Sequence, residues 1–222
     1  YPKDNPLSSG KVEIKYMTAK EEDILTNSSF IRKGTVLDKL LESVIISKIN
    51  IDDLIVGDKN ALLIATRILG YGSQYEVEIN GEKETIDLSQ LENKEFDESQ
   101  ITQGLNEFQF TLPHTNTPIT YKILTGSDEK KLEKEIEGIK RIKKDSNPSL
   151  STRLKYIITS VNGDTERKAI NEFVDGYLLA KDSKALRDHI KETQPDVDLN
   201  VIIDSGQEVR IPIGLGFFWP DA

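Results

Sequence analysis

The chain of 222 residues has a formal net charge of −9, 36% hydrophobic and 30% charged residues, no cysteine and only two histidines. This length suits one domain or two small ones. The acidic balance argues against nucleic acid as the main partner, because phosphate contacts need clustered Lys and Arg. The lack of cysteine excludes disulfides, thiol catalysis and cysteine-ligated zinc or iron–sulfur sites, and two histidines leave little scope for other transition-metal sites.

No stretch of the sequence approaches the roughly 20 apolar residues that a membrane helix needs. The start, YPKDNPLSSG, is polar and proline-rich, so we expect no signal peptide there. These features agree with a cytosolic protein that works with other proteins. The chain begins without Met, so residues can precede Tyr1.

The N-terminal residues read as an extended arm followed by a helical part. The arm covers residues 1–16 and has a candidate strand at Val12–Tyr16. Thr18 and Glu21 have the spacing of a capping box, which predicts a short helix that runs to about Asn27.

Two further helices are predicted in this N-terminal helical part, which we assign to residues 17–70. One runs from Thr35 to Ile49 with Thr35 as its cap, and the next begins at Asp58 as cap and stops at Gly70. The apolar face of the first has helical spacing and consists of Leu37, Leu40, Leu41, Val44 and Ile45. We expect the apolar faces of these helices to pack against one another and form a core.

Hairpins follow in residues 71–125. Tyr75–Ile79 and Thr85–Leu88 alternate apolar and polar residues on either side of an Asn80–Gly81 turn, which is a strong hairpin signal. NEFQFTLPHTNTPITYKIL reads as a second hairpin with its turn near His114–Thr117.

The C-terminal helical part is assigned to residues 126–195. It opens with a highly charged helix capped by Ser127, whose narrow apolar stripe predicts a largely exposed helix or one that packs along a single seam. The stripe consists of Leu132, Ile136, Ile139 and Ile142. Further helices are predicted at Ser151–Val161, Thr165–Ala180 and Asp182–Glu192.

The last part, residues 196–222, reads as a hairpin that turns at Ser205–Gly206, followed by an aromatic tail. The order of helices and hairpins predicts an α+β protein of helical segments with two or three β-hairpins. The first and last hairpins resemble each other and are candidates to pair in space. The five parts together are expected to form one structural unit.

No catalytic constellation is visible in the sequence. His114 and His189 both read as solvated surface histidines, and no G-x-S-x-G elbow is present. Gly70 and Gly72 belong to no complete phosphate loop, so we assign them to a helix end and a tight turn. The acidic runs lack the spacing of a calcium loop and read as helix caps and solvated faces.

The C-terminal segment IPIGLGFFWPDA holds the only tryptophan, directly after two phenylalanines. Such rings contribute large buried areas and dominate interfaces. The tail can fold back into its own core, dock into a neighbouring subunit, or combine the two with Phe217 inward and Trp219 outward. The interface residues that we predict are Phe217, Phe218, Trp219, Pro220, Tyr71 and Arg67.

Several segments together resemble one family, the baseplate hub subunit and hub-assembly proteins of T-even-type contractile-tailed phages. These segments are MTAKEEDILTNSSFIRKGTVLDKLL (17–41), GDKNALLIATRILGYGSQYEV (57–77), FTLPHTNTPITYKILTGSDE (110–129), DTERKAINEFVDGYLLAKDSKALRDHIKETQPDVDL (164–199) and IPIGLGFFWPD (211–221). The resemblance covers nearly the whole chain.

The chain departs from the family in the residues that could bind zinc. Many members carry Cys-x-x-Cys pairs at the tips of two hairpins, which match Asn80–Gly81 and Ser205–Gly206 here. This chain lacks both pairs, so no zinc is carried over. The resemblance then implies a ribbon-like unit, if the hairpins pair, that is held by its turns and packing instead of a metal.

The resemblance implies a structural subunit of the baseplate, located in the virion tail after assembly in the host cytoplasm. Its implied partners are other baseplate and hub proteins, the spike or the tape-measure protein, and copies of itself in a threefold or sixfold ring. It implies no enzymatic activity, no cofactor, no nucleic acid and no membrane. The alternative is a transient assembly chaperone that leaves before completion, and a third class is a cell-wall hydrolase of the tail tip.

Overall fold

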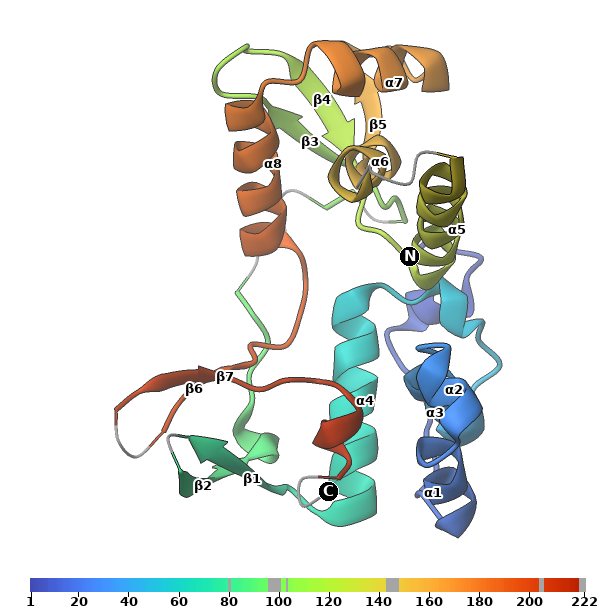
Figure 1. Cartoon of the computed structure of the whole chain (residues 1–222), viewed down its shortest axis with the longest axis vertical. Helices are drawn as coiled ribbons and strands as arrows, with labels where there is room; N and C mark the ends of the chain where they lie inside the picture. The colour runs from blue at the N-terminus through green and yellow to red at the C-terminus, as the bar shows by residue number, and fades with distance from the viewer. Residues whose placement is uncertain (80, 96–100, 103, 143–147, 204–205, 220–222) are drawn as a thin grey trace. The chain divides into compact units, whose positions relative to one another are not determined.

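The computed structural model describes residues 1–79, 81–95, 101–102, 104–142, 148–203 and 206–219, with the helices and strands drawn in Figure 1. The chain forms two compact units. Unit 1 comprises Tyr1–Ser9, Asp52–Ile55 and Glu95–Gln194, and unit 2 comprises Gly10–Ile51, Val56–Lys94 and Pro195–Ala222. The predicted α+β class is confirmed. The five parts predicted in chain order do not coincide with these units, because each unit gathers segments that are distant in sequence.

Unit 2 combines helices with two hairpins. Its helices and strands are α1 (Ala19–Leu25), α2 (Ser28–Arg32), α3 (Val36–Val44), α4 (Val56–Tyr71), β1 (Gln74–Ile79), β2 (Glu82–Asp87), β6 (Asn200–Ile202) and β7 (Glu208–Arg210). β1 pairs with β2 and β6 with β7, both antiparallel, which confirms the first and last predicted hairpins. Asn80 and Ser205, predicted in the turns, lie outside the described residues. The hairpins are separate two-stranded sheets that share one apolar core, to which Tyr75 of one and Ile203 of the other belong.

The first helices of unit 2 begin at polar caps. The capping box of Thr18 and Glu21 is present at α1, as predicted. Asn27, expected to end a helix, instead begins α2: its Oδ1 accepts hydrogen bonds from the backbone N–H groups of Ser29 and Phe30, at 3.0 and 3.2 Å. The prediction missed α2 because Asn is favoured both after one helix and before the next.

Two predicted helix ends in unit 2 are wrong. α3 stops at Val44 rather than Ile49, because the following backbone pairs with the segment around Ile14: Lys15 N–H donates to the Val44 carbonyl and Ile46 N–H to the Glu13 carbonyl, both at 2.8 Å. α4 extends past Gly70, at which an added Cβ would lie 3.0 Å from the Met17 sulfur. The residue that follows α4 with a positive φ of 87° is Gly72.

The predicted extended arm divides between the two units. Residues 1–9 belong to unit 1, where the Tyr1 hydroxyl accepts a hydrogen bond from the Ile55 N–H at 3.1 Å and the Asn5 amide donates to the Asp53 carboxylate at 3.0 Å. The remainder, including the candidate strand, forms a single bridge between Ile14 and Ile45 in unit 2.

Unit 1 is built on a three-stranded antiparallel sheet with strand order β3-β4-β5. Its strands and helices are β3 (Phe108–Thr111), β4 (Pro118–Tyr121), β5 (Ile158–Val161), α5 (Gly126–Ile142), α6 (Ser149–Ile157), α7 (Arg167–Gly176) and α8 (Ala180–Thr193). The β3–β4 hairpin is confirmed. The core of the unit includes Leu112, Tyr121, Leu132 and Leu186.

β5 corrects the prediction of a helix over Ser151–Val161. The helix α6 ends at Ile157, and Ile158–Val161, in which three of the four residues are β-branched, then pairs with β4. The Thr120 hydroxyl lies 2.7 Å from the hydroxyls of both Thr159 and Ser160. An available strand edge therefore overrides the helical pattern of the sequence.

Two predicted helix starts in unit 1 are also wrong, the cap at Ser127 and the first helical residue at Asp182. Ser127 lies inside α5, and the reciprocal cap is made by Thr125 and Asp128, with Thr125 N–H 3.2 Å from Asp128 Oδ2 and Asp128 N–H 3.3 Å from Thr125 Oγ1. Asp182 lies inside α8 and accepts hydrogen bonds from the backbone N–H groups of His114 and Thr115, at 2.9 and 3.2 Å. This buried carboxylate ties the β3–β4 turn to α8.

The buried Glu21 predicts how unit 2 responds to acid. Its carboxylate is fully buried and accepts hydrogen bonds from Lys15 at 2.8 Å, from Ser43 at 2.6 Å and from the N–H and hydroxyl of Thr18. Burial alone would raise the pKa of Glu21, but these hydrogen bonds outweigh it and hold the pKa below its usual range. Stability from this group is therefore present above the unfolded pKa of about 4.3 and is lost as the pH falls further.

We predict that Glu21→Gln lowers the free energy of unfolding by about 2 kcal/mol at pH 7, because it removes charge-assisted hydrogen bonds. It should also reduce the loss of stability on acidification. Urea unfolding at neutral and acidic pH measures both effects. The matched control is Asp23→Asn, an exposed carboxylate on the same helix; an equal effect of both variants would contradict the prediction.

Candidate functional site

The predicted interface residues converge on the end of α4 in unit 2. α4 supplies Arg67 and Tyr71 from its last turns, and the C-terminal segment supplies Phe217, Phe218 and Trp219. β1 adds Tyr75, which the prediction missed; strand alternation marked it as apolar but gave no sign of its partners. We call Arg67, Tyr71, Tyr75, Phe217, Phe218 and Trp219 the aromatic cluster. Pro220 lies outside the described residues.

Arg67 lies at the centre of the aromatic cluster and is only 4% exposed. Its Nε donates to the Phe217 carbonyl and one terminal nitrogen to the Gly72 carbonyl, both at 3.1 Å. The guanidinium also lies over the rings of Tyr71 and Tyr75, at 5.0 and 6.0 Å from their centroids. Burial lowers the pKa of Arg67, and the two tyrosines oppose this shift.

No carboxylate of the described residues forms an ion pair with Arg67. The cation is held instead by carbonyl oxygens and ring faces. These acceptors come from the α4–β1 connection and from the C-terminal segment, so Arg67 fixes the tail to the end of the helix.

The two phenylalanines of the tail serve the core of their own chain. Phe217 and Phe218 are each 1% exposed and contact each other edge-to-face at 5.5 Å between centroids. Phe217 also contacts Tyr75 at 5.1 Å. Of the alternatives left open by the sequence, self-packing therefore holds for these two rings.

Tyr71 and Trp219 form the outer edge of the aromatic cluster. Tyr71 is 37% exposed, Trp219 is half-buried, and their ring centroids are 6.2 Å apart. The Tyr71 hydroxyl donates to Glu22 at 3.2 Å. Burial, followed by this hydrogen bond and the charge of Glu22, raises the pKa of Tyr71 to about 12. The neutral Tyr71 ring and the half-buried Trp219 ring leave aromatic surface at this edge, beside the carboxylate of Glu22.

The two histidines lie in different environments. His114 is exposed and engages Asp182 through its backbone N–H. The expectation of a solvated His189 is wrong: its ring stacks on Phe110 at 4.4 Å and meets the edge of Tyr121 at 5.7 Å. His189 Nε2 is buried and has no hydrogen-bond partner among the described residues. Burial lowers the pKa of His189, with Glu192 opposing the shift, so the half-buried ring packs as a neutral aromatic against Phe110 and Tyr121.

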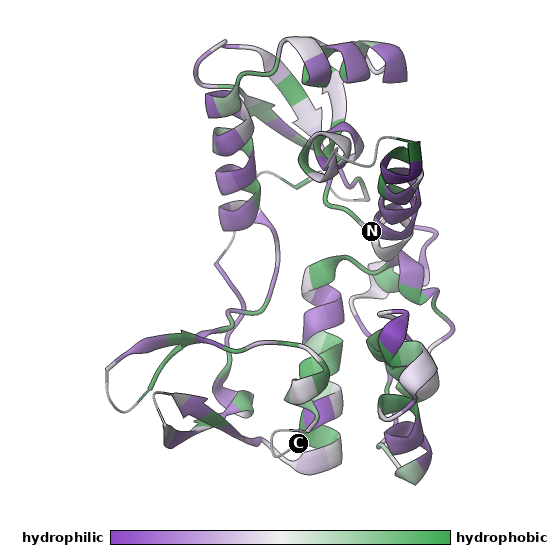
Figure 2. Ribbon diagram, viewed as in Figure 1, coloured by the Kyte–Doolittle hydropathy of each residue, from purple (hydrophilic) through white to green (hydrophobic). Residues whose placement is uncertain are grey.

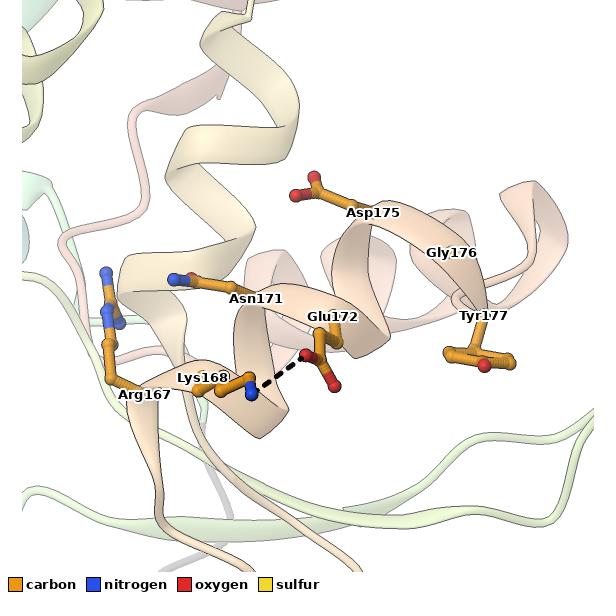
Figure 3. Close-up of a pocket in the computed structure, with 7 residues that line it drawn as sticks. All are labelled: Arg167, Lys168, Asn171, Glu172, Asp175, Gly176 and Tyr177. Atoms are coloured by element: carbon orange, nitrogen blue, oxygen red, sulfur yellow. Dashed lines mark ion pairs between the residues drawn. The ribbon is translucent and has the colours of Figure 1, made fainter.

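A shallow depression follows the exposed side of α7 (Figure 3). Its lining carries charges of both signs: Lys168 lies 3.8 Å from Glu172, and Asp175 pairs with Lys155 of α6 at 2.7 Å. The exposed Tyr177 lies at one end. The described lining places no nucleophile beside a base, so it offers no arrangement for nucleophilic catalysis.

Among the described residues, no group of three or more His, Cys, Asp or Glu side chains is placed to hold a metal ion. In the same part of the chain, no helix has the length and apolar character required to cross a membrane.

The half-buried His189 predicts a second pH effect, in unit 1. Because its folded pKa lies below the unfolded value of about 6.5, the unfolded chain binds the proton first, and stability falls as the pH drops through this range. We predict that His189→Phe reduces the difference in urea midpoint between pH 7.5 and pH 5.5. His114→Gln, at an exposed ring, is the control; a wild-type midpoint that does not change over this range would contradict the prediction.

For the aromatic cluster, we predict that Arg67→Lys lowers the free energy of unfolding by about 1–3 kcal/mol, because an ammonium cannot serve both carbonyls and both ring faces at once. Trp219, the only tryptophan, reports the loss through its fluorescence during urea unfolding. Arg210→Lys is the matched control, since Arg210 is exposed on β7. An equal loss in both variants would show that the geometry of Arg67 is not what matters.

Comparisons of the chain with protein-family models, with curated proteins and with solved structures found no significant match.

Proposed function

We propose that the protein is a structural component of a phage tail baseplate hub region and acts through protein–protein contacts in tail assembly. The proposal rests on the resemblance of the segments quoted above to baseplate hub proteins. The observation that carries it is the outer edge of the aromatic cluster, where Tyr71 and Trp219 remain accessible on a rigid support.

This edge has the properties of an interface anchor. Tyr and Trp are enriched among the residues that dominate binding energies, because they bury large areas and keep one polar group for a hydrogen bond. Arg67 and the buried phenylalanines hold the edge in place before any partner arrives. Less conformational entropy is then lost on binding. Other baseplate and hub proteins, spike or tape-measure proteins, and neighbouring copies of this chain are the proposed partners.

A transient assembly chaperone is the second candidate. It is favoured by α5, whose charged surface and exposed end suit reversible contacts. The two candidates differ in one observable, since a structural subunit remains in the finished tail and a chaperone does not.

The test is quantitative mass spectrometry of purified virions from the phage that encodes the chain. For the wild type, we expect a fixed number of copies per tail that is a multiple of three or six. Trp219→Ala and Tyr71→Ala should each lower incorporation about tenfold or more, as for truncation of an interface anchor. Tyr177→Ala, at a 72% exposed aromatic of unit 1, is the matched control.

One outcome would overturn the structural role, and another would overturn the anchor assigned to it. Absence from virions together with presence in assembly intermediates would favour the chaperone. Normal incorporation of both folded edge variants would remove the aromatic cluster as the anchor.

A further inference from the structure

The sheet of unit 1 has a strand edge at β3 that the described chain does not pair. Beside the β3–β4 ladder, the Leu112 N–H donates to the Thr117 carbonyl at 3.0 Å. Because the backbone groups of an antiparallel strand point alternately to one side and the other, this bond fixes which residues face away from β4. They are Glu107, Gln109 and Thr111, all exposed, and we call them the β3 edge. No hydrogen bond from another described residue reaches their outward backbone groups.

β3 also lacks the features that usually protect a strand edge. Such edges are blunted by charged side chains, by proline or by bulges. β3, with the sequence FQFT, contains no charge and no proline, and its register with β4 is unbroken. On the opposite side of the sheet, the register between β4 and β5 shifts, and the Val161 N–H of β5 donates to the Asp164 carbonyl of its own chain at 2.9 Å. β3 is therefore the edge at which another strand can pair.

We propose that β3 pairs with β3 of a second copy of this chain, antiparallel about a twofold axis beside Gln109, so that the two sheets become continuous. In this register Gln109 lies opposite Gln109 of the second copy, and Glu107 lies opposite Thr111. Each residue of the β3 edge then donates one backbone hydrogen bond and accepts one. The same surface serves both copies, as a twofold contact requires.

The sequence around β3 selects this register. Because side chains alternate between the two faces of a sheet, only shifts of two residues keep like faces together. A shift in one direction places Pro113, which has no N–H, opposite Glu107. A shift in the other direction brings the Glu107 carboxylates of the two copies closer together, which costs binding free energy. The register centred on Gln109 keeps every donor and separates the two acids.

The side chains that this register brings together are compatible. Phe108 and Phe110 are half-buried on one face of the sheet, where Phe110 stacks on His189 at 4.4 Å between centroids. Phe108 lies opposite Phe110 of the second copy in the closer type of pair, and aromatic pairs across strands stabilise a sheet. On the other face, the Thr111 hydroxyl can donate to the Glu107 carboxylate opposite.

The helix that covers the phenylalanine face presents mixed charge. α8 lies over β3 and β4 together, because His189 contacts both Phe110 and Tyr121. Figure 2 shows α8 coloured hydrophilic over most of the side in view. Its exposed charged residues near His189 are Arg187, Asp188, Lys191 and Glu192. A second copy therefore meets both signs of charge beside the β3 edge, and not a repulsive surface of one sign.

The contact is short, so the dimer is weak. Interfaces below about 1,000 Å² in total belong to the weak and transient class. Several copies held in one assembly would strengthen such a contact by raising the effective concentration. The proposal does not depend on the baseplate role, because dimerisation is measured on the isolated chain.

The first test measures association by sedimentation velocity from micromolar to millimolar concentration. The wild type should show a concentration-dependent monomer–dimer equilibrium. Gln109→Lys and Gln109→Glu should each weaken it about tenfold or more, because each places like charges opposite each other at the axis. An equimolar mixture of the two variants should associate again, because lysine then lies opposite glutamate.

The matched control is Gln90→Lys, at an exposed glutamine of unit 2, which should leave the equilibrium unchanged. A wild-type chain that stays monomeric throughout the concentration range would overturn the proposal and leave the β3 edge to a strand of another protein. A mixture of the two charged variants that associates no better than either variant alone would also overturn it.

Gln109→Pro tests whether the backbone makes the contact. Proline removes the outward N–H of residue 109 and leaves the bonds to β4 in place, and edge strands accept proline where the N–H faces outward. Circular dichroism should show an intact fold, and the dimer should be about tenfold weaker or more. A dimer of unchanged strength in the folded variant would contradict pairing through the backbone.

A third test determines the register. The chain has no cysteine, so Gln109→Cys and Thr111→Cys each carry one thiol. In the proposed pair the Cα atoms of residue 109 lie about 5.5 Å apart, within the range for a disulfide. Those of residue 111 are separated by about 14 Å along the strands. Oxidation should therefore link the Gln109→Cys variant into a covalent dimer and not the Thr111→Cys variant. Links at neither position, or equally at both, would overturn the proposal.

Discussion

The arrangement of unit 2 depends on the hydrogen bonds that the Arg67 guanidinium donates to two backbone carbonyls. A buried cation is costly unless its donors are used. Here they bind the carbonyl of Gly72, which follows the end of α4, and the carbonyl of Phe217, which lies in the C-terminal segment. The rings of Tyr71 and Tyr75 complete the surroundings. The outer edge of the aromatic cluster is ordered because the buried part of the same cluster is fixed.

Buried carboxylates do the corresponding work elsewhere in the chain. Glu21 binds the start of α1 to Lys15 and Ser43, and Asp182 binds the β3–β4 turn to α8. Each carboxylate accepts hydrogen bonds from backbone N–H groups, which satisfies groups that would otherwise be buried without partners. In a chain with net charge −9, part of the acidic composition therefore serves the interior as well as the solvated surface.

Sequence signals that span a few residues predicted the features that are determined by interactions between neighbours in sequence. The three hairpins and the capping box at Thr18 could be read from the sequence because turn residues and caps act over a few positions. β5 could not, because Ile158–Val161 becomes a strand only when the edge of β4 is beside it. Arg67, Tyr71 and the tail were each predicted as interface residues, but their convergence and the burial of Arg67 in the core were not predicted. The partners of Arg67 are backbone carbonyls, which no residue type reveals.

The interleaving of the two units has a consequence for synthesis on the ribosome. Unit 1 draws its last segment from Glu95–Gln194, so all of its residues have been made before the final segment of unit 2, Pro195–Ala222, is added. Until then unit 2 lacks Phe217 and Phe218, and Arg67 lacks one of its carbonyl acceptors. The unit whose helices are translated first is thus the last to close its core, and the nascent chain carries an open apolar surface until Pro195–Ala222 has been synthesised.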